Sequence, residues 1–135
     1  MTGQAQHVAQ LHPQLHRALA PAMAATGAYY HSTWRPQIDC SRHAGPCSPT
    51  SKHSLPGGIA EAADLDAPGV SKADVGFWRG VASRVTDPCV EWGGPADANH
   101  FELQWDRCGG PSPLRPRQLA AIVVGLAVVL GLALS

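Results

Sequence analysis

The sequence predicts a mostly irregular head that contains a small α+β unit, a helix plus a β-hairpin, followed by a C-terminal transmembrane α-helix. Three observations support this fold class: scarce core-forming residues, clustered helix and hairpin signals, and an apolar run near the C-terminus. In residues 1–118, Val, Ile, Leu and Phe make up about 14%, below the roughly 20% under which chains build weak cores. We therefore expect four segments: a low-order region at 1–70, a helix-plus-hairpin unit at 71–108, a Pro/Arg linker at 109–118 and a hydrophobic membrane segment at 119–134.

The N-terminal region carries short-range helix and strand signals. Apolar side chains at helical three-four spacing are Val8, Leu11, Leu15, Ala18 and Leu19. Pro13 is compatible with the first turn of this helix, whereas Pro21 is expected to end or kink it. The aromatic segment 29–34 favours a short edge strand or a loop. Because ordering costs about 1–2 kcal/mol per residue, we expect residues 1–70 to be mostly irregular, with isolated short helices.

The segment 39–58 is rich in Ser, Pro and Gly, which indicates a loop. It contains two thiols and two imidazoles, the donor types that suit tetrahedral zinc: Cys40, His43, Cys47 and His53. Their order and spacing differ from those of common zinc fingers, so free or solvated side chains are the alternative. A small acidic cluster follows at Glu61, Asp64 and Asp66, which is compatible with a cation but typical of a solvated loop.

Residues 71–108 combine the signals of a helix and a hairpin. Ser71 and Asp74 resemble a capping box, and an apolar stripe follows them: Val75, Trp78, Val81, Ala82 and Val85. Two alternating segments then flank a Gly- and Pro-containing turn. We expect the helix to pack on this hairpin. If Trp92 lies opposite Trp105, Cys89 lies opposite Cys108.

The cysteines allow two interpretations that depend on the cellular compartment. Cys89 and Cys108 flank the predicted hairpin, and a disulfide between them would contribute roughly 3 kcal/mol by loop closure. Four cysteines allow three pairings. In an oxidising compartment we expect Cys40–Cys47 and Cys89–Cys108, and in a reducing compartment four free thiols.

The segment 119–134 has no charged or polar side chain. As a helix it would span roughly 24 Å, shorter than the roughly 30 Å hydrocarbon core of a bilayer, but a thin bilayer can accommodate the difference. Arg115 and Arg117 stand directly before it. By the positive-inside rule these side chains keep the head cytoplasmic, so we expect a single-pass tail anchor with the lipid bilayer as a partner.

The same C-terminal region has two other interpretations. Small residues at Gly109, Gly110 and Ser112, followed by a short polar spacer and the apolar run, fit a cleavable GPI signal. That signal would place the head in the lumen or outside the cell, but residues 17–28 make a poor secretory leader. A buried core helix is the third possibility.

Composition and motifs restrict the classes of function. The chain has 10 basic and 10 acidic side chains, so we expect no nucleic-acid partner, which normally requires a basic patch. It contains no Gly-x-Ser-x-Gly, phosphate-loop or His-Glu-x-x-His motif. We therefore expect a C-terminally anchored membrane protein with a non-enzymatic head, no cofactor and an unknown protein partner. The alternatives are a secretory-pathway disulfide-bonded module, and a weakly selected reading frame whose composition reflects GC-rich codons.

Overall fold

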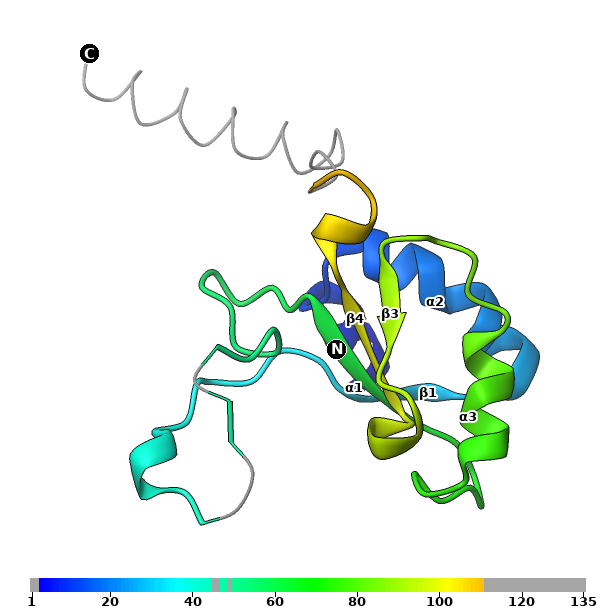
Figure 1. Ribbon diagram of the computed structural model, residues 1–135, viewed down its shortest axis with the longest axis horizontal. Coiled ribbons are helices and arrows are strands. Elements are labelled where there is room, and N and C mark those ends of the chain that lie inside the picture. Colours follow the sequence, from blue (N-terminus) through cyan, green and yellow to red (C-terminus); the bar gives the residue numbers. More distant parts are fainter. Residues whose placement is uncertain (1–2, 45–46, 49, 111–135) are drawn as a thin grey trace.

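An antiparallel sheet organises the computed structural model, which describes residues 3–44, 47–48 and 50–110 (Figure 1). The strands of this described part are β1 (Tyr29–Ser32), β2 (Ala62–Asp66), β3 (Val90–Trp92) and β4 (His100–Leu103). They lie in the order β1-β2-β4-β3. The helices are α1 (Gly3–Ala9), α2 (Pro13–Thr26) and α3 (Val75–Ala82), and short 3-10 turns occur at Cys40–Arg42, Pro95–Asp97 and Trp105–Arg107. In Figure 1, α2 and α3 lie together beside the sheet, whereas the segment between β1 and β2 extends away from it.

The sheet has one apolar and one polar face, because side chains alternate along each strand. Leu65 of β2 and Phe101 of β4 are at most 1% exposed, and they share one core with Leu15 of α2 and Trp78 of α3. Within each strand, the residues that alternate with these buried ones face the other way. Asp64 of β2, for example, is only partly buried. Helices α2 and α3 therefore cover one face of the sheet and leave polar side chains on the opposite face.

Residues 3–70 differ from the mostly irregular region expected from the sequence. They supply α1, α2, β1 and β2, and Leu15 and Leu19 are fully buried. The core of this region relies on small side chains as well as large ones: Ala22, Ala60 and Ala63 are 0% exposed. Alanines let backbones approach closely and lose no side-chain entropy on burial, so a count of large apolar residues underestimates this core.

Helix α2 passes through Pro21 and does not end there. It starts as expected, with Pro13 in the first turn and the His12 ring accepting the Gln14 N–H at 3.1 Å. It ends at Gly27, whose left-handed φ of 79° lets its N–H donate to the Met23 carbonyl at 2.9 Å. Pro21 is on the exposed side of the helix, where its ring leaves the buried side undisturbed.

The region 71–108 contains α3, β3 and β4, but two details differ from the expectation. Asp74, rather than Ser71, caps α3, because its carboxylate accepts the Phe77 N–H at 3.2 Å. The β3–β4 register places Trp92 opposite Phe101 rather than Trp105. Strand β4 ends at Leu103, and the following 3-10 turn, rather than a longer strand, brings the chain back towards β3.

This region is also not a separate unit. Strand β4 pairs with β2 as well as with β3, so the hairpin forms half of a larger sheet. The boundary expected at residue 70 therefore does not divide the core.

The expectations for the C-terminal region fall on residues outside the described part of the chain. These are Arg115, Arg117, Ser112 and the segment 119–134, together with most of the linker. Among residues 3–44, 47–48 and 50–110, no helix combines the length and apolar character needed to cross a membrane.

Candidate metal centre

A cluster of two histidines and one aspartate lies on the polar face of the sheet. Asp64 comes from β2, His100 from β4 and His53 from the segment before β2, and one potential ligand atom of each lies within 4.8 Å of the others. Asp64 Oδ1 is 2.8 Å from His100 Nδ1, and Asp64 Oδ2 is 3.5 Å from His53 Nε2. Because Asp64 and His100 are opposite each other in the β2–β4 register, the sheet itself sets half of this geometry.

The position of His53 is set by hydrogen bonds at the base of its loop. The Arg35 N–H donates to the His53 carbonyl at 2.8 Å, and the Trp34 indole N–H donates to the Leu55 carbonyl at 2.9 Å. These bonds hold the two arms of the loop together. His53 is thereby buried over the sheet, with 3% of its side chain exposed.

The two ring nitrogens of His53 have different surroundings. Nδ1 lies 2.6 Å from the Thr33 carbonyl oxygen, which can only accept, so Nδ1 carries a proton and donates it. In the neutral ring Nε2 is then an acceptor. Nε2 is buried without a hydrogen-bond partner among the described residues, and it faces the Asp64 carboxylate. His53 Nε2 and Asp64 Oδ2 are both acceptors and lie 3.5 Å apart, so a cation between them would satisfy both.

His100 lies between two carboxylates, with Nδ1 on Asp64 and Nε2 at 3.1 Å from Glu102 Oε1. Burial disfavours its charged form, but hydrogen bonds to Asp64 and Glu102 outweigh burial and raise the pKa of His100 to about 9. Burial alone would likewise raise the pKa of Asp64, yet its hydrogen bond to His100 and the nearby His53 imidazole lower that pKa. The cluster therefore favours a cation at its centre, either a proton or a metal ion.

Polar clefts open on both sides of the cluster. One has a volume of about 520 Å³, and the side chains around it include Arg35, Asp64 and Asp97. Arg35 Nη1 is 3.5 Å from Asp64 Oδ2, and half of the Arg35 side chain is exposed. Another cleft, of about 330 Å³, is bordered by His53 and His100. The cluster is thus reachable by a small molecule from solvent.

Asp97 reaches the edge of the cluster from the turn between β3 and β4. Its Oδ2 lies 3.9 Å from His100 Nδ1, and its side chain is 62% exposed. The turn depends on Gly93, because a Cβ there would be 2.2 Å from the Asp97 carbonyl oxygen. Gly94 follows with a left-handed φ of 75°, which glycine adopts without strain.

Only one of the four metal ligands suggested by the sequence belongs to this cluster. The sulfur atoms of Cys40 and Cys47 are bonded to each other, with 5.6 Å between the Cα atoms, so they are not free thiolate ligands. His43 is exposed on the same loop. His53 instead joins Asp64 and His100, because the loop base directs it towards the sheet.

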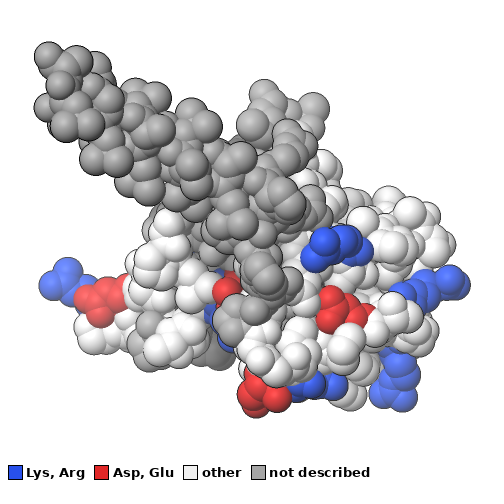
Figure 2. All heavy atoms as spheres, turned by 90° about the horizontal axis from the view of Figure 1, so that it is seen from above, with Lys and Arg blue, Asp and Glu red and all other residues white. Residues whose placement is uncertain are grey.

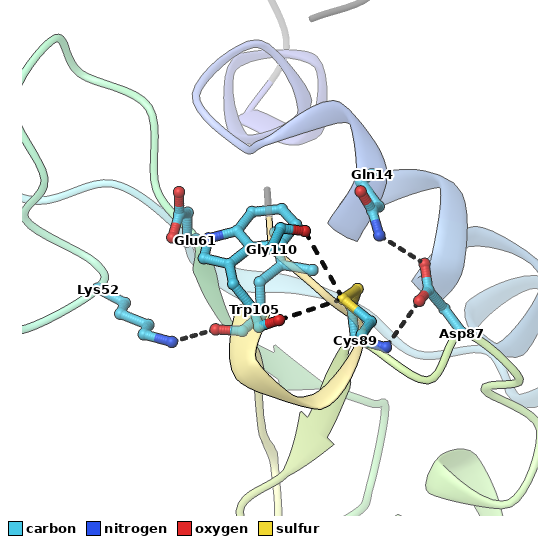
Figure 3. The surroundings of a disulfide bond; sticks show 9 residues. Gln14, Lys52, Glu61, Asp87, Cys89, Trp105 and Gly110 are labelled. Carbon is cyan, nitrogen blue, oxygen red and sulfur yellow. Dashed lines mark hydrogen bonds between the residues drawn. A yellow bond between two sulfur atoms is a disulfide. The ribbon is translucent and has the colours of Figure 1, made fainter. Parts of the chain in front are cut away.

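The second disulfide joins Cys89 and Cys108, with 5.1 Å between their Cα atoms. Cys89 is 4% exposed, and Asp87 accepts its N–H at 2.8 Å and the Gln14 side-chain N–H at 3.1 Å (Figure 3). This pair of bonds links the disulfide to α2. On the other side, the Trp105 indole N–H donates to Glu61 at 2.9 Å. Hydrogen bonds to other elements therefore hold the chain on both sides of this disulfide.

On the face shown in Figure 2, the acidic and basic side chains of the described residues are interspersed rather than gathered by sign. No protein-family model, curated protein or solved structure matches this chain.

Sequence reasoning missed the roles of His100 and Asp97. His100 directly follows the Gly- and Pro-containing turn segment, and it is the first residue of β4. The detectable signal is the alternation at 100–103, where polar and apolar residues exchange places. Asp64 has the same alternation in β2, so one face of each strand carries an ionisable group.

Proposed function

We propose that this chain is a metal-dependent hydrolase of an oxidising compartment, acting on an amide or ester carbonyl. The observation that carries the proposal is the buried Nε2 of His53, which faces Asp64 at 3.5 Å and has no hydrogen-bond partner in the described part of the chain. The proposal departs from the non-enzymatic, protein-binding head expected from the sequence. If the test shows metal binding without hydrolysis, the expectation of a non-enzymatic head is restored.

The donor set fits a zinc-type ion. Zinc takes imidazole nitrogens and carboxylate oxygens at about 2.0–2.2 Å in tetrahedral sites, so two ligands lie roughly 3.4 Å apart. His53 Nε2 lies 3.5 Å from Asp64 Oδ2, and His100 Nδ1 lies 2.8 Å from Asp64 Oδ1. The three ligand atoms lie within 4.8 Å of one another, so small side-chain rotations would bring them onto one ion. Outer partners are also present, because the Thr33 carbonyl holds His53 and Glu102 holds His100. Metal-binding histidines typically have such partners on the nitrogen that faces away from the metal.

The number of ligands supports catalysis rather than a purely structural role. Structural zinc sites usually have four protein ligands, whereas catalytic sites have three and keep one position open. The described residues offer three, His53, Asp64 and His100. Asp64 borders the cleft of about 520 Å³, and the two histidines border the cleft of about 330 Å³. Metal ions bound in this way polarise a carbonyl group and make water more acidic.

The remaining residues of the cleft have roles that follow from their chemistry. Asp97 is exposed and 3.9 Å from His100 Nδ1, so its carboxylate can take a proton from a water in the cleft. Arg35 presents a half-exposed guanidinium beside Asp64, and its fork of donors suits a carbonyl oxygen or a carboxylate of the substrate. Glu102 is itself held by Lys52 at 3.2 Å, which leaves it to orient His100.

The disulfides support the choice of compartment. All four cysteines lie among the described residues and are paired, and such bonds persist in oxidising environments. We propose that residues 119–134 attach this domain to a membrane, with the domain on the oxidising side. The tail-anchored cytoplasmic head remains the alternative, and it requires free thiols.

Metal titration of the full chain tests the catalytic proposal. After removal of metals with a chelator, zinc is expected to bind one to one in calorimetry, and the zinc-loaded protein is expected to hydrolyse members of a fluorogenic panel of peptide amides and esters. Asp64→Asn should abolish tight zinc binding. Asp97→Asn should keep zinc binding and lose hydrolysis. His43→Ala, which removes an exposed histidine of the same loop, is the matched control and should change neither.

Three results would contradict parts of this proposal. Absence of zinc binding would remove the metal centre altogether. Binding that survives Asp64→Asn would place the metal elsewhere. Stoichiometric binding without hydrolysis of any substrate would favour the non-enzymatic alternative.

Alkylation of membrane fractions with and without reductant tests the compartment. Thiols that react only after reduction, in a membrane pellet, support the oxidising side. Thiols that react without reductant support the cytoplasmic head.

A further inference from the structure

A continuous chain of hydrogen bonds leads from helix α1 to the candidate metal centre. His7 Nδ1 of α1 is 2.9 Å from the Thr33 hydroxyl oxygen, and the Thr33 carbonyl oxygen is 2.6 Å from His53 Nδ1. Thr33 is 0% exposed and His53 is 3% exposed. The two bonds made by Thr33 thus connect the N-terminal helix to a proposed metal ligand.

Thr33 lies where the sheet no longer controls the backbone. The pairing of β1 with β2 extends to Ser32 opposite Asp64 and contains an irregularity after Tyr30. Thr33 is the next residue, so strand pairing does not orient its carbonyl. The hydroxyl of Thr33 instead fastens this residue to His7.

Helix α1 is itself held against β1. The side-chain amide of Gln4 donates to the Tyr30 carbonyl at 2.7 Å and accepts the Tyr30 N–H at 2.9 Å. These two bonds fix helix α1 relative to strand β1. Helix α1, which carries His7, is therefore also held to β1 through Gln4.

We infer that His7 and Thr33 are positioning residues of the metal centre, which hold the His53 ring with Nε2 directed at Asp64. The inference rests on the proposed metal function and adds the part that α1 has in it. The Thr33 carbonyl selects the ring tautomer in which Nε2 is free to bind a metal. The contact with His7 keeps that carbonyl in place.

The size of the effect follows from comparable outer partners. Loss of a group that orients a metal-binding histidine typically reduces metal affinity by 10- to 100-fold. The Thr33 hydroxyl acts one step further out, through its own backbone, so we expect about tenfold, the lower end of that range.

Substitutions at Thr33 and His7 test the inference in the full chain. Thr33→Val preserves the side-chain shape and removes the hydroxyl, whereas Thr33→Ser keeps the hydroxyl and removes only the methyl group. His7→Phe removes the same bond from the other side. Zinc affinity is measured by competition with a chromophoric chelator, and the visible spectrum of the cobalt-substituted protein reports ligand geometry. Thr26→Val, which removes a hydroxyl bonded to the Ala22 carbonyl at 2.7 Å in α2, is the matched control.

The expected result is about tenfold weaker zinc binding and an altered cobalt spectrum for Thr33→Val and His7→Phe. Thr33→Ser and Thr26→Val should resemble the wild type. The double variant of Thr33→Val and His7→Phe should bind zinc no more weakly than either single variant, because both substitutions remove the same hydrogen bond. Urea unfolding of the metal-free proteins separates a general loss of stability from a loss of metal affinity.

Two results would overturn the inference. If Thr33→Val and His7→Phe bind zinc with wild-type affinity and give an unchanged cobalt spectrum, α1 has no positioning role although the metal centre exists. If the wild type binds no metal, the proposed function fails and the inference fails with it.

Discussion

Removal of the Cys89–Cys108 disulfide is expected to destabilise the fold by about 3 kcal/mol. The two cysteines are 19 residues apart in sequence, and loop-closure entropy for a loop of this size corresponds to roughly 3.3 kcal/mol at 25 °C. By the same relation Cys40–Cys47, with a separation of 7 residues, would contribute roughly 2.5 kcal/mol. Cys89 also belongs to the buried core, so its replacement adds a packing cost that the exposed loop disulfide lacks.

The measurement is urea unfolding followed by Trp fluorescence, on the wild type and on the paired Cys→Ser variants of each disulfide. Small domains lose about 1–3 kcal/mol per molar urea, so the midpoint of the Cys89/Cys108 variant should fall by roughly 1–3 M. The Cys40/Cys47 variant should lose less, because hydrogen bonds already close the base of its loop. Equal midpoints for the wild type and the Cys89/Cys108 variant would refute the reasoning, as would a larger effect of the loop disulfide.

Four further predictions concern two core residues, the turn and the C-terminal segment. Burial raises the pKa of Tyr30 above its ordinary value of 10.0; the unfolded chain loses this proton first, so the free energy of unfolding should fall as the pH rises above about 10, and Tyr30→Phe should flatten that fall in urea titrations. Gly93→Ala should displace Asp97, lowering hydrolysis at least tenfold while zinc binding persists, and unchanged kinetics would show that the turn has no catalytic part. Leu19→Ala should cost about 2–5 kcal/mol in unfolding free energy, and a loss below 1 kcal/mol would mean that α2 is not docked. Deletion of 119–135 should release the chain from carbonate-washed membranes, and retention in the pellet would contradict the anchor.

Local signals in the sequence identified elements, but they did not identify their partners. Pro13 and the three-four spacing of Leu15 and Leu19 indicated a helix, and α2 occurs there. Its continuation past Pro21 depends on tertiary packing, because the buried side of the helix outweighs the loss of one backbone hydrogen bond. The strand β2 has no strong local signal, since Ala62 and Ala63 have little β-propensity and pair only because β1 and β4 flank them.

The candidate site shows the same division. His53 and Asp64 were each singled out as ionisable groups in separate clusters, the first with cysteines and the second with acidic residues. Their meeting with His100 depends on the β2–β4 register and on a loop closed by backbone hydrogen bonds. Neither leaves a linear motif, so spacing rules for zinc fingers and metalloproteases could not find the cluster.

The amide of Gln4 has a consequence for the behaviour of the protein at high concentration. Strand β1 is at an edge of the sheet, and an edge strand with open backbone groups can recruit a strand of another molecule and begin aggregation. Gln4 occupies both the N–H and the carbonyl of Tyr30, so part of this edge is already taken by the chain itself. A form of the protein that lacks α1 would expose the Tyr30 N–H and carbonyl to other molecules and should associate more readily than the full chain.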